Sequence, residues 1–206
     1  PLPHILLSGP SGMGKTELAK CVASEMGVQC LAWYGSPSSK RWQLARHLSR
    51  VEKKGDIVFV DEIHALQDGV QELLYPAIDG WRVPVVDAER HHIKENEWMD
   101  IPAFTLVVAT DQPGQLTNAL KQRLVLRYTL GCYAEAEMRL IVMNRAAEIG
   151  VLLSPQAARR IALASRGVPR RARHILQSLK TCLKDPEASV TKTASDRHLL
   201  SLGIDK

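Results

Sequence analysis

Residues 4–16 read "HILLSGPSGMGKT", and this stretch decides the fold class, because a short apolar run leads into a glycine-rich loop. Residues 9–16, "GPSGMGKT", fit the spacing G-x-x-x-x-G-K-[S/T]. A loop of this kind directs backbone N–H groups at phosphate oxygens, at the start of a helix whose dipole favours an anion. We therefore expect the stretch to bind the phosphates of a nucleoside triphosphate.

Each residue of the loop has an expected role. Lys15 is expected to reach the β- and γ-phosphates, and the hydroxyl group of Thr16 is expected to bind Mg²⁺. A chance match in a glycine-rich turn is the competing interpretation, and the strand before the loop and the helix after it argue against it. The residues expected to surround the phosphates are Gly9, Pro10, Ser11, Gly12, Met13, Gly14, Lys15 and Thr16.

A second motif, "IVFVDEIH" at residues 57–64, places two carboxylates at the end of an apolar strand. Asp61 is expected to hold Mg²⁺ together with Thr16. Glu62 can orient and deprotonate an attacking water molecule. A kinase for small molecules does not need the second carboxylate, whereas a hydrolase does. The alternative is a solvated Asp-Glu pair that caps the following helix.

The pattern of apolar residues predicts strands that alternate with helices, which indicates a parallel sheet with helices on both faces. In the first helix, residues 15–27, Leu18, Val22 and Met26 recur on one face at helical spacing, and Gly27 is a natural stop. Two more helices are expected at residues 38–55 and 70–80. Five strands are expected, at residues 4–8, 28–34, 56–62, 104–111 and 125–130.

Beyond Gly131 the pattern becomes helical throughout. Ser154 and Pro155 suit the cap and first turn of one of these helices. We expect an α/β nucleotide-binding domain at residues 1–131 and a small all-helical lid domain at 132–206. The helices are expected at residues 134–150, 154–167, 169–185 and 193–203.

The net charge of +5 is unevenly distributed. Residues 1–132 carry 14 Lys/Arg against 15 Asp/Glu, and residues 133–206 carry 13 against 7. Such an excess suits either a surface for nucleic acid or an acidic partner, or a solvated helical face. No apolar run approaches the roughly 18 residues of a membrane span, so no membrane partner is expected.

The four cysteines lie far apart in the sequence and form no C-x-x-C pair. We expect reduced, buried thiols in a cytoplasmic protein, without a zinc site or a disulfide framework. The chain opens without a secretory signal, which agrees with this expectation. The cysteines are Cys21, Cys30, Cys132 and Cys182.

Taken together, the motifs resemble those of the AAA+ ATPases and, within them, of the RuvB family of Holliday-junction branch-migration motors. The resemblance covers nearly the whole chain, and its segments occur in the order of the family. They are residues 9–28, "GPSGMGKTELAKCVASEMGV"; 58–66, "VFVDEIHAL"; 72–83, "ELLYPAIDGWRV"; 101–126, "IPAFTLVVATDQPGQLTNALKQRLVL"; and 164–176, "ASRGVPRRARHIL".

The resemblance implies an ATP- and Mg²⁺-dependent ring, a hexamer in this family, that acts on DNA. It implies that Arg123 is an arginine finger, which stabilises the transferring phosphoryl group in the neighbouring subunit's site. Without the resemblance, Arg123 would be read as a surface charge. It also implies that residues 81–98 form a β-hairpin insertion, which docks a protein partner in this family; the adjacent His91 and His92 suit a solvated turn better than a metal site.

The resemblance assigns Arg170 to the sensor-2 position, and the sequence supports this independently. Pro169 suits the first turn of a helix and places Arg170 and Arg171 at its N-terminus. Cations are disfavoured there by roughly 0.3–1 kcal/mol, and a phosphate anion would resolve that conflict. Otherwise both arginines bend into solvent.

The chain also departs from the family pattern. Thr110 is followed by Asp111 at the sensor-1 position, where the family offers a neutral polar group. An anion there repels the γ-phosphate unless it orients water or turns toward a neighbour's Arg123. The segment around Arg123 lacks the usual acidic and aromatic residues. The DNA-gripping winged-helix domain of the family is not in the sequence, so we expect a fragment or a shortened relative.

Two functions of different class follow. The first is an oligomeric, ATP-hydrolysing DNA motor with Glu62, Thr110, Asp111, Arg123 and Arg170 in the hydrolysis site. The second is a nucleotide-dependent switch or scaffold that remodels or recruits a protein partner, which Asp111 favours. A small-molecule kinase is a weaker third interpretation, because the Asp61-Glu62 pair and Arg170 argue against it.

Overall fold

The computed structural model describes residues 1–87, 89–183 and 189–204. Its residues group into two compact units, one of Pro1–Pro10 with Lys15–Leu130 and one of Ser11–Gly14 with Gly131–Lys206. The expected division into domains at residues 1–131 and 132–206 stays a prediction, because a grouping by contacts does not test which segments fold independently.

The first unit contains a five-stranded sheet in the order β2-β3-β6-β1-β7, and every neighbouring pair is parallel. The predicted five-stranded parallel fold is therefore confirmed. Because all five strands run the same way, their carboxyl ends, where Ser8, Asp61 and Thr110 lie, share one edge of the sheet. The strands are β1 (Ile5–Ser8), β2 (Cys30–Tyr34), β3 (Ile57–Asp61), β6 (Thr105–Thr110) and β7 (Leu126–Thr129).

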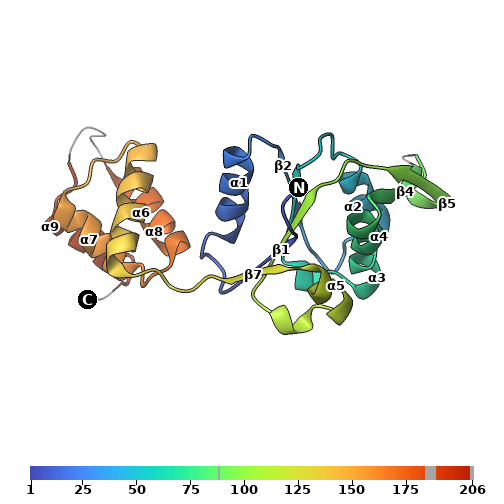
Figure 1. The fold of residues 1–206 in the computed structure, drawn as a ribbon. Coiled ribbons are helices and arrows are strands. Elements are labelled where there is room, and N and C mark those ends of the chain that lie inside the picture. Colours follow the sequence, from blue (N-terminus) through green and yellow to red (C-terminus); the bar gives the residue numbers. More distant parts are fainter. Residues whose placement is uncertain (88, 184–188, 205–206) are drawn as a thin grey trace. The chain divides into compact units, whose positions relative to one another are not determined.

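Both faces of the sheet are covered, as the continuous apolar strands require. Alternate residues of β3 face opposite sides, so that Ile57 and Phe59 join one core cluster and Val58 and Val60 join the other. Figure 1 shows α1 (Lys15–Glu25) on one face and α2 (Arg41–Leu48) with α4 (Leu74–Asp79) on the other. The result is a three-layered α/β unit.

The face of α1 on which large apolar residues recur is not the face that is buried. Leu18 and Met26 are exposed, and Val22 is only partly buried, whereas Ala19 and Ala23 are buried against the sheet. Small side chains let the helix backbone approach the strands closely. Leu18 and Met26 therefore lie on the outer side of the helix, while Val22 packs at the edge of the sheet core.

The expected helix at residues 70–80 is broken into α3 (Asp68–Gln71) and α4. Pro76 accounts for the break, since it has no N–H group to donate to the carbonyl of Glu72, and its ring clashes with that carbonyl. The link between the two helices contains a tighter turn instead, in which the N–H of Tyr75 donates to the oxygen of Glu72 at 3.1 Å.

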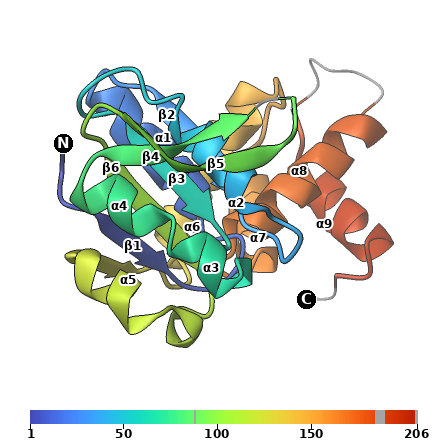
Figure 2. The same ribbon diagram turned by 90° about the vertical axis from the view of Figure 1, so that its right-hand side faces the viewer.

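The expected hairpin is present as β4 (Arg82–Asp87) and β5 (His92–Asp100), which pair antiparallel apart from the main sheet. Figure 2 shows the two strands side by side. The ring of His91, in the turn, stacks on Trp42 of α2 with centroids 4.7 Å apart. Three short elements follow strands of the main sheet. The 3₁₀ turn η1 (Ile63–Ala65) follows β3, and η2 (Pro113–Gln115) and α5 (Asn118–Arg123) follow β6.

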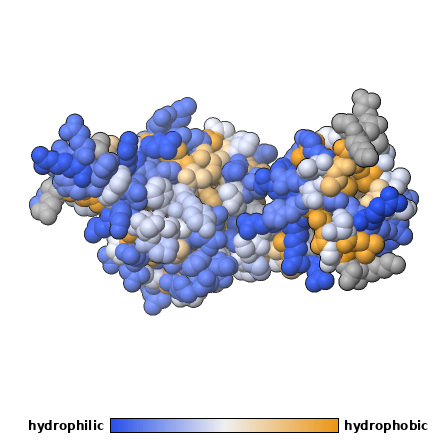
Figure 3. Space-filling model, turned by 180° about the vertical axis from the view of Figure 1, so that it is seen from behind, coloured by the Kyte–Doolittle hydropathy of each residue, from blue (hydrophilic) through white to orange (hydrophobic). Residues whose placement is uncertain are grey.

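The second unit is helical in its described part, as expected. Its core is formed by apolar side chains from all four helices, including Val142, Ile161, Leu176 and Leu199. Figure 3 shows that apolar surface also remains exposed on this unit, and Leu140 and Leu200 are the most exposed of the large apolar side chains in its described part. The helices are α6 (Glu135–Glu148), α7 (Pro155–Ala164), α8 (Pro169–Cys182) and α9 (Lys192–Ser201).

The cysteines are free, but the expectation that they are buried is wrong. Cys21, Cys132 and Cys182 are exposed, and Cys30 is partly buried. The first three lie on outer helix faces or in a connection, where no apolar cluster demands a small hydrophobic residue. Within the described ranges, no helix is both long enough and apolar enough to cross a membrane.

Candidate active site

The glycine-rich loop joins the end of β1 to the start of α1, and its backbone requires glycine. Gly9 has φ 134° and Gly12 has φ 86°, which L side chains rarely adopt. A Cβ atom at Gly9 would lie 2.2 Å from the carbonyl oxygen of Leu130, so the space is closed as well. The loop therefore keeps one tight path from the sheet to the helix.

Lys15 is buried, with 6% of its surface exposed, although it carries a charge. Its Nζ donates to the backbone oxygens of Gly9 at 2.7 Å and Pro10 at 3.1 Å. Buried charges need partners of this kind. The loop thus holds the ammonium group against its own backbone, beside the segment predicted to bind phosphate.

Thr16 and Asp61 meet although 45 residues separate them. The Thr16 hydroxyl donates to Oδ2 of Asp61 at 2.9 Å, and Oδ1 of Asp61 accepts the N–H of Glu62 at 3.0 Å. Thr16 lies in the first turn of α1, and Asp61 ends β3, so both lie at the carboxyl edge of the sheet. The two residues predicted to share Mg²⁺ are in direct contact.

Glu62 follows in a left-handed backbone conformation, with φ 50° and ψ 43°. Such a conformation in a residue other than glycine costs about 1–3 kcal/mol and is common at functional sites. Gly35, after β2, makes room for it, because a Cβ atom at Gly35 would lie 2.4 Å from the Glu62 oxygen.

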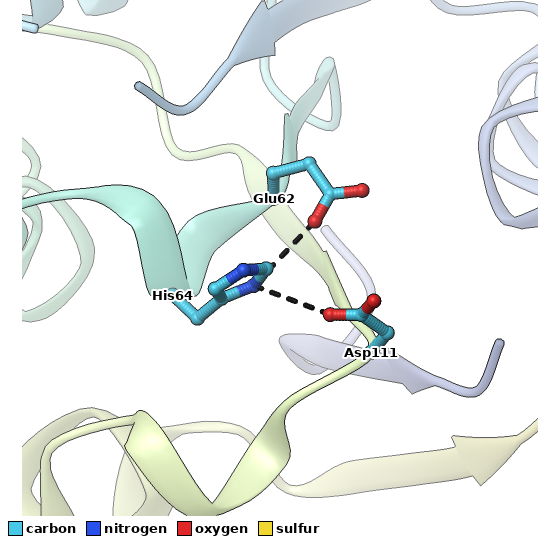
Figure 4. A group of neighbouring side chains, drawn as sticks. All are labelled: Glu62, His64 and Asp111. Atoms are coloured by element: carbon cyan, nitrogen blue, oxygen red, sulfur yellow. Dashed lines mark ion pairs between the residues drawn. The ribbon is translucent and has the colours of Figure 1, made fainter. Parts of the chain in front are cut away.

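Glu62, His64 and Asp111 form one cluster, drawn in Figure 4. Nδ1 of His64 lies 3.5 Å from Oε2 of Glu62 and 3.7 Å from Oδ1 of Asp111. The three side chains offer nitrogen and oxygen atoms within 4.8 Å of one another, a set of donors that also suits a metal ion. Asp111 is therefore turned toward His64.

Both ring nitrogens of His64 have hydrogen-bond partners. Nδ1 lies 2.9 Å from the hydroxyl oxygen of Thr110, and Nε2 lies 3.2 Å from the side-chain nitrogen of Gln112. The Thr110 hydroxyl oxygen also accepts the backbone N–H of Gln112 at 2.9 Å. Thr110 is fully buried at the end of β6, so its hydroxyl group faces His64 from a fixed position.

Arg123 lies apart from this cluster, at the end of α5. Its Nε and Nη2 atoms donate to the carboxylate of Asp79, with Nη2 to Oδ2 at 2.6 Å. Nη1 donates to the oxygen of Ala119 at 2.9 Å, and the guanidinium carbon lies 4.7 Å from the centre of the Tyr75 ring. Hydrogen bonding with Asp79 raises the pKa of Arg123 above its usual value.

Arg170 lies at the start of α8, and within the second unit it contacts the tip of the glycine-rich loop. Its Nη1 donates to the Ser11 hydroxyl oxygen at 2.7 Å, and its backbone N–H donates to the oxygen of Gly12 at 3.3 Å. Gly12 is required here too, because a Cβ atom would lie 2.8 Å from that of Arg170. Arg170 thus contacts the tip of the loop, and its assignment to the sensor-2 position stays a prediction.

With this geometry established, comparison with known proteins gives a clear result. Residues 1–130 match the family model described as the Holliday junction DNA helicase RuvB P-loop domain. The chain belongs to the RuvB family. It is 36% identical over 208 residues to the Holliday junction branch migration complex subunit RuvB of Ehrlichia chaffeensis, and 36% identical over 208 residues to that of Ehrlichia canis.

Solved structures agree with this assignment. The Thermotoga maritima RuvB Holliday junction branch migration motor matches with a TM-score of 0.81 and 33% identity, covering 99% of this chain and 63% of that one. A point mutant of the same protein matches with a TM-score of 0.83 and 33% identity, covering 99% and 64%. The chain spans 63% of the length of each Ehrlichia RuvB.

Membership of the RuvB family implies nucleotide binding, and the structure brings together most of the residues expected to carry it. Lys15, Thr16, Asp61 and Glu62 gather at the carboxyl edge of the sheet. His64 and Gln112 were not among the predicted site residues, and the packing role of Gly35 was not predicted either. The signal for His64 was present in "VDEIH", because a histidine lies two residues after the carboxylate assigned to water activation.

Proposed function

We propose that this chain supplies the ATP-hydrolysing part of an oligomeric, RuvB-type motor that acts on branched DNA. The observation that carries the proposal is the contact between Thr16 and Asp61 at 2.9 Å, with Glu62 as the next residue. Nucleotide binding alone needs only the loop. A hydroxyl group, a carboxylate and a second carboxylate at one edge of the sheet are the set that hydrolysis needs.

The phosphates would be bound by the backbone N–H groups of the loop at residues 9–14 and by Lys15. The carbonyl oxygens of Gly9 and Pro10 already hold the Lys15 ammonium group beside the loop. A triphosphate is a stronger acceptor than a carbonyl group, so the ammonium group would exchange at least one of these bonds for a phosphate oxygen.

Mg²⁺ fits the hydroxyl group of Thr16 and the carboxylate of Asp61. Both are hard oxygen donors, which Mg²⁺ prefers, and they are adjacent. When bound with ATP, Mg²⁺ neutralises negative charge on the phosphate oxygens. Glu62, oriented by its left-handed backbone, would accept a proton from the attacking water molecule.

The two arginines would act on the developing charge in the sites of different subunits. Arg170, held at the loop tip through Ser11, would contact the phosphates of its own chain. Arg123 would serve the site of a neighbouring subunit in a ring, a hexamer by resemblance. Three of its five N–H groups are engaged by Asp79 and Ala119, and two remain for a phosphoryl oxygen.

We further propose DNA as the substrate of the full assembly, and the hairpin formed by β4 and β5 as the docking surface for a protein partner. Trp98 and Met99 of that hairpin are exposed. The free thiols suit the reducing conditions of the cytoplasm, where we place this activity.

The test is the ATPase rate per subunit, measured over a range of protein concentrations with and without a four-way DNA junction. We expect the rate per subunit to rise with concentration and to rise again when the junction is added. The Lys15→Ala variant should bind no ATP while keeping its circular dichroism spectrum. A rate that neither concentration nor DNA changes would contradict a motor.

A nucleotide-dependent switch that recruits a protein partner is the second candidate. The observation that favours it is the Asp111 carboxylate close to Glu62, because a second negative charge beside the phosphates opposes hydrolysis. Tight ATP binding with slow turnover that DNA does not stimulate would identify the switch.

A further inference from the structure

The imidazole ring of His64 faces three oxygen atoms through a single nitrogen. Nδ1 lies 2.9 Å from the Thr110 hydroxyl oxygen, 3.5 Å from Oε2 of Glu62 and 3.7 Å from Oδ1 of Asp111. Two of the three are carboxylate oxygens, which only accept hydrogen bonds when ionised. A lone pair at Nδ1 would face their negative charge, whereas an N–H group at Nδ1 is attracted by it.

The contact at Nε2, on the other side of the ring, favours the same tautomer, with the N–H group at Nδ1. The amide of Gln112 accepts a hydrogen bond from the side chain of Gln115 through its oxygen, so its NH₂ group is directed at Nε2 of His64, 3.2 Å away. In this arrangement Nε2 accepts and Nδ1 carries the N–H group. The chain of side chains from Gln115 to His64 thus sets which nitrogen donates.

The arrangement also resolves a conflict between two like charges. Oxygen atoms of Glu62 and Asp111 lie within 4.8 Å of each other, and His64 is only partly exposed. Carboxylates at this distance repel, and the repulsion turns one side chain away unless a donor lies between them. The Nδ1–H group of His64, whose hydrogen-bond partner is the Thr110 hydroxyl oxygen, lies near both carboxylates and presents its partial positive charge to them at 3.5 and 3.7 Å.

We propose that His64 is a positioning residue for hydrolysis. Its Nδ1–H group, fixed by the Thr110 hydroxyl oxygen, attracts the Glu62 carboxylate from 3.5 Å and offsets the charge of Asp111, which replaces the neutral residue that the family pattern offers. His64 touches neither water nor phosphate in this role. The inference deepens the proposed function and rests on it for its kinetic consequences, but the tautomer of His64 is independent of any activity.

The first test uses three substitutions of His64 and two readouts, kcat and the Kd for ATP. His64→Ala removes the donor and should lower kcat roughly ten- to a hundredfold, because a misplaced base forfeits part of its contribution of about 10²–10⁴-fold. The Kd for ATP should stay within about twofold, since Lys15 and the loop bind the phosphates.

Two matched substitutions, His64→Asn and His64→Gln, distinguish the loss of a hydrogen-bond donor from the loss of side-chain volume. The side-chain nitrogen of asparagine occupies nearly the position of Nδ1, whereas that of glutamine reaches the position of Nε2. His64→Asn should therefore recover most of the activity that His64→Ala loses, and His64→Gln should not. His174→Asn, on an exposed face of α8, is the control and should leave kcat unchanged. Equal activity of the Asn and Gln variants would overturn the proposal.

The second test is a double-mutant cycle with Asp111→Thr. If His64 offsets the charge of Asp111, then His64→Ala should cost much less, about threefold or less, once Asp111 is replaced. Additive losses would mean that His64 and Asp111 act independently, and the offsetting role would be wrong.

The third test needs no hydrolysis. A long-range ¹⁵N–¹H spectrum of the histidine rings in the nucleotide-free protein should show His64 protonated at Nδ1, and Gln112→Ala should shift it toward the other tautomer. A proton on Nε2 overturns the inference even if ATP is hydrolysed. An inactive wild-type protein whose His64 carries the proton on Nδ1 would instead refute the proposed function and leave this arrangement standing.

Discussion

At the scale of single residues, Glu62 has a left-handed backbone conformation that is unfavourable for a residue other than glycine. Its φ of 50° costs about 1–3 kcal/mol in folding free energy. Such a cost is retained where the direction of the side chain matters more than stability. A residue that only capped the following helix would not require it, and the cap of η1 in fact contains no side-chain hydrogen bond from Glu62.

We therefore expect Glu62→Gln to bind ATP normally and to hydrolyse it about a hundredfold more slowly or worse, because an amide cannot accept the proton of water. Binding of a fluorescent ATP analogue and steady-state phosphate release measure the two effects. Glu25→Gln, at the exposed end of α1, is the matched control. Turnover of Glu62→Gln within a fewfold of wild type would show that another group activates water.

His47 provides a prediction about stability and pH. Burial lowers its pKa below the usual 6.5; a hydrogen bond with the backbone of Leu31 opposes this, and the positive charge of Arg50 adds to it. The unfolded chain therefore takes up a proton at a higher pH than the folded chain. Stability should fall as the pH falls through about 6.5, and the loss through this group ends below its folded-state pKa.

Urea unfolding at a series of pH values between neutral and mildly acidic measures this dependence. His47→Gln should reduce the slope of unfolding free energy against pH in this range. The slope should not vanish, because burial lowers the pKa values of His4 and His198 in the same direction. An unchanged slope in the variant would show that His47 titrates alike in both states.

At the scale of elements, α5 is fixed at both ends by contacts with neighbouring residues. Thr117 caps its start by accepting the N–H of Leu120 at 3.2 Å, and the Thr117 hydroxyl group also lies 2.8 Å from that of Tyr75. The Tyr75 ring in turn packs against Arg123, the last residue of α5. The cap and the predicted finger are therefore linked through one aromatic side chain.

Thr117→Ala should lower the free energy of unfolding by about 1 kcal/mol, the usual value of a lost N-cap. It should also lower the ATPase rate of the assembled protein, because Tyr75 loses its partner beside Arg123. Thr117→Ser keeps the hydroxyl group and should restore both properties. Thr191→Ala removes the same kind of cap from α9 and should affect stability alone. If both Thr117→Ala and Thr191→Ala lowered the ATPase rate, the loss would come from general destabilisation and not from the contact between Tyr75 and Arg123.

The sequence predicts the strands well and the helix surfaces less well, for physical reasons. Apolar runs such as residues 57–60 have no wet face, so only a central parallel strand suits them. In α1, by contrast, Leu18 and Met26 recur at helical spacing but are exposed, whereas Ala19 and Ala23 are buried against the sheet. Close backbone approach favours alanine, and no pattern of hydrophobicity along one helix reveals how close its neighbour lies.

In the site, too, the sequence does not predict contacts that depend on tertiary structure. The motifs fix residue type and spacing together, so they predict Lys15, Thr16, Asp61 and Glu62. The contact of His64 with Asp111 joins a 3₁₀ turn to the end of β6, and it depends on tertiary structure. The pairing of Arg123 with Asp79, 44 residues apart in the chain, is equally invisible in the sequence.

At the scale of the whole molecule, the proposed assembly makes a prediction about mixed subunits. Arg123→Ala should lower the ATPase rate about 10³-fold or more, the usual value of an arginine finger. Lys15→Ala subunits bind no ATP but still carry Arg123. Mixing the two inactive proteins should therefore restore part of the activity, at sites where an intact finger meets an intact loop.

Phosphate release against the mixing ratio measures this complementation. It should pass through a maximum near equal proportions and be absent from either protein alone. Arg50→Ala is the control for a lost surface charge and should be active without mixing. If no activity were recovered at any ratio, Arg123 would act in the site of its own chain or would have no part in hydrolysis.

The close approach of Gly35 to the backbone of Glu62 constrains the evolution of both positions. A methyl group at position 35 would lie 2.4 Å from the Glu62 oxygen, so glycine is required there while Glu62 keeps its left-handed turn. A descendant that no longer hydrolysed ATP would be released from both requirements at once. Positions 35 and 62 should therefore covary in an alignment, and a relative with a larger residue at the first should lack glutamate at the second.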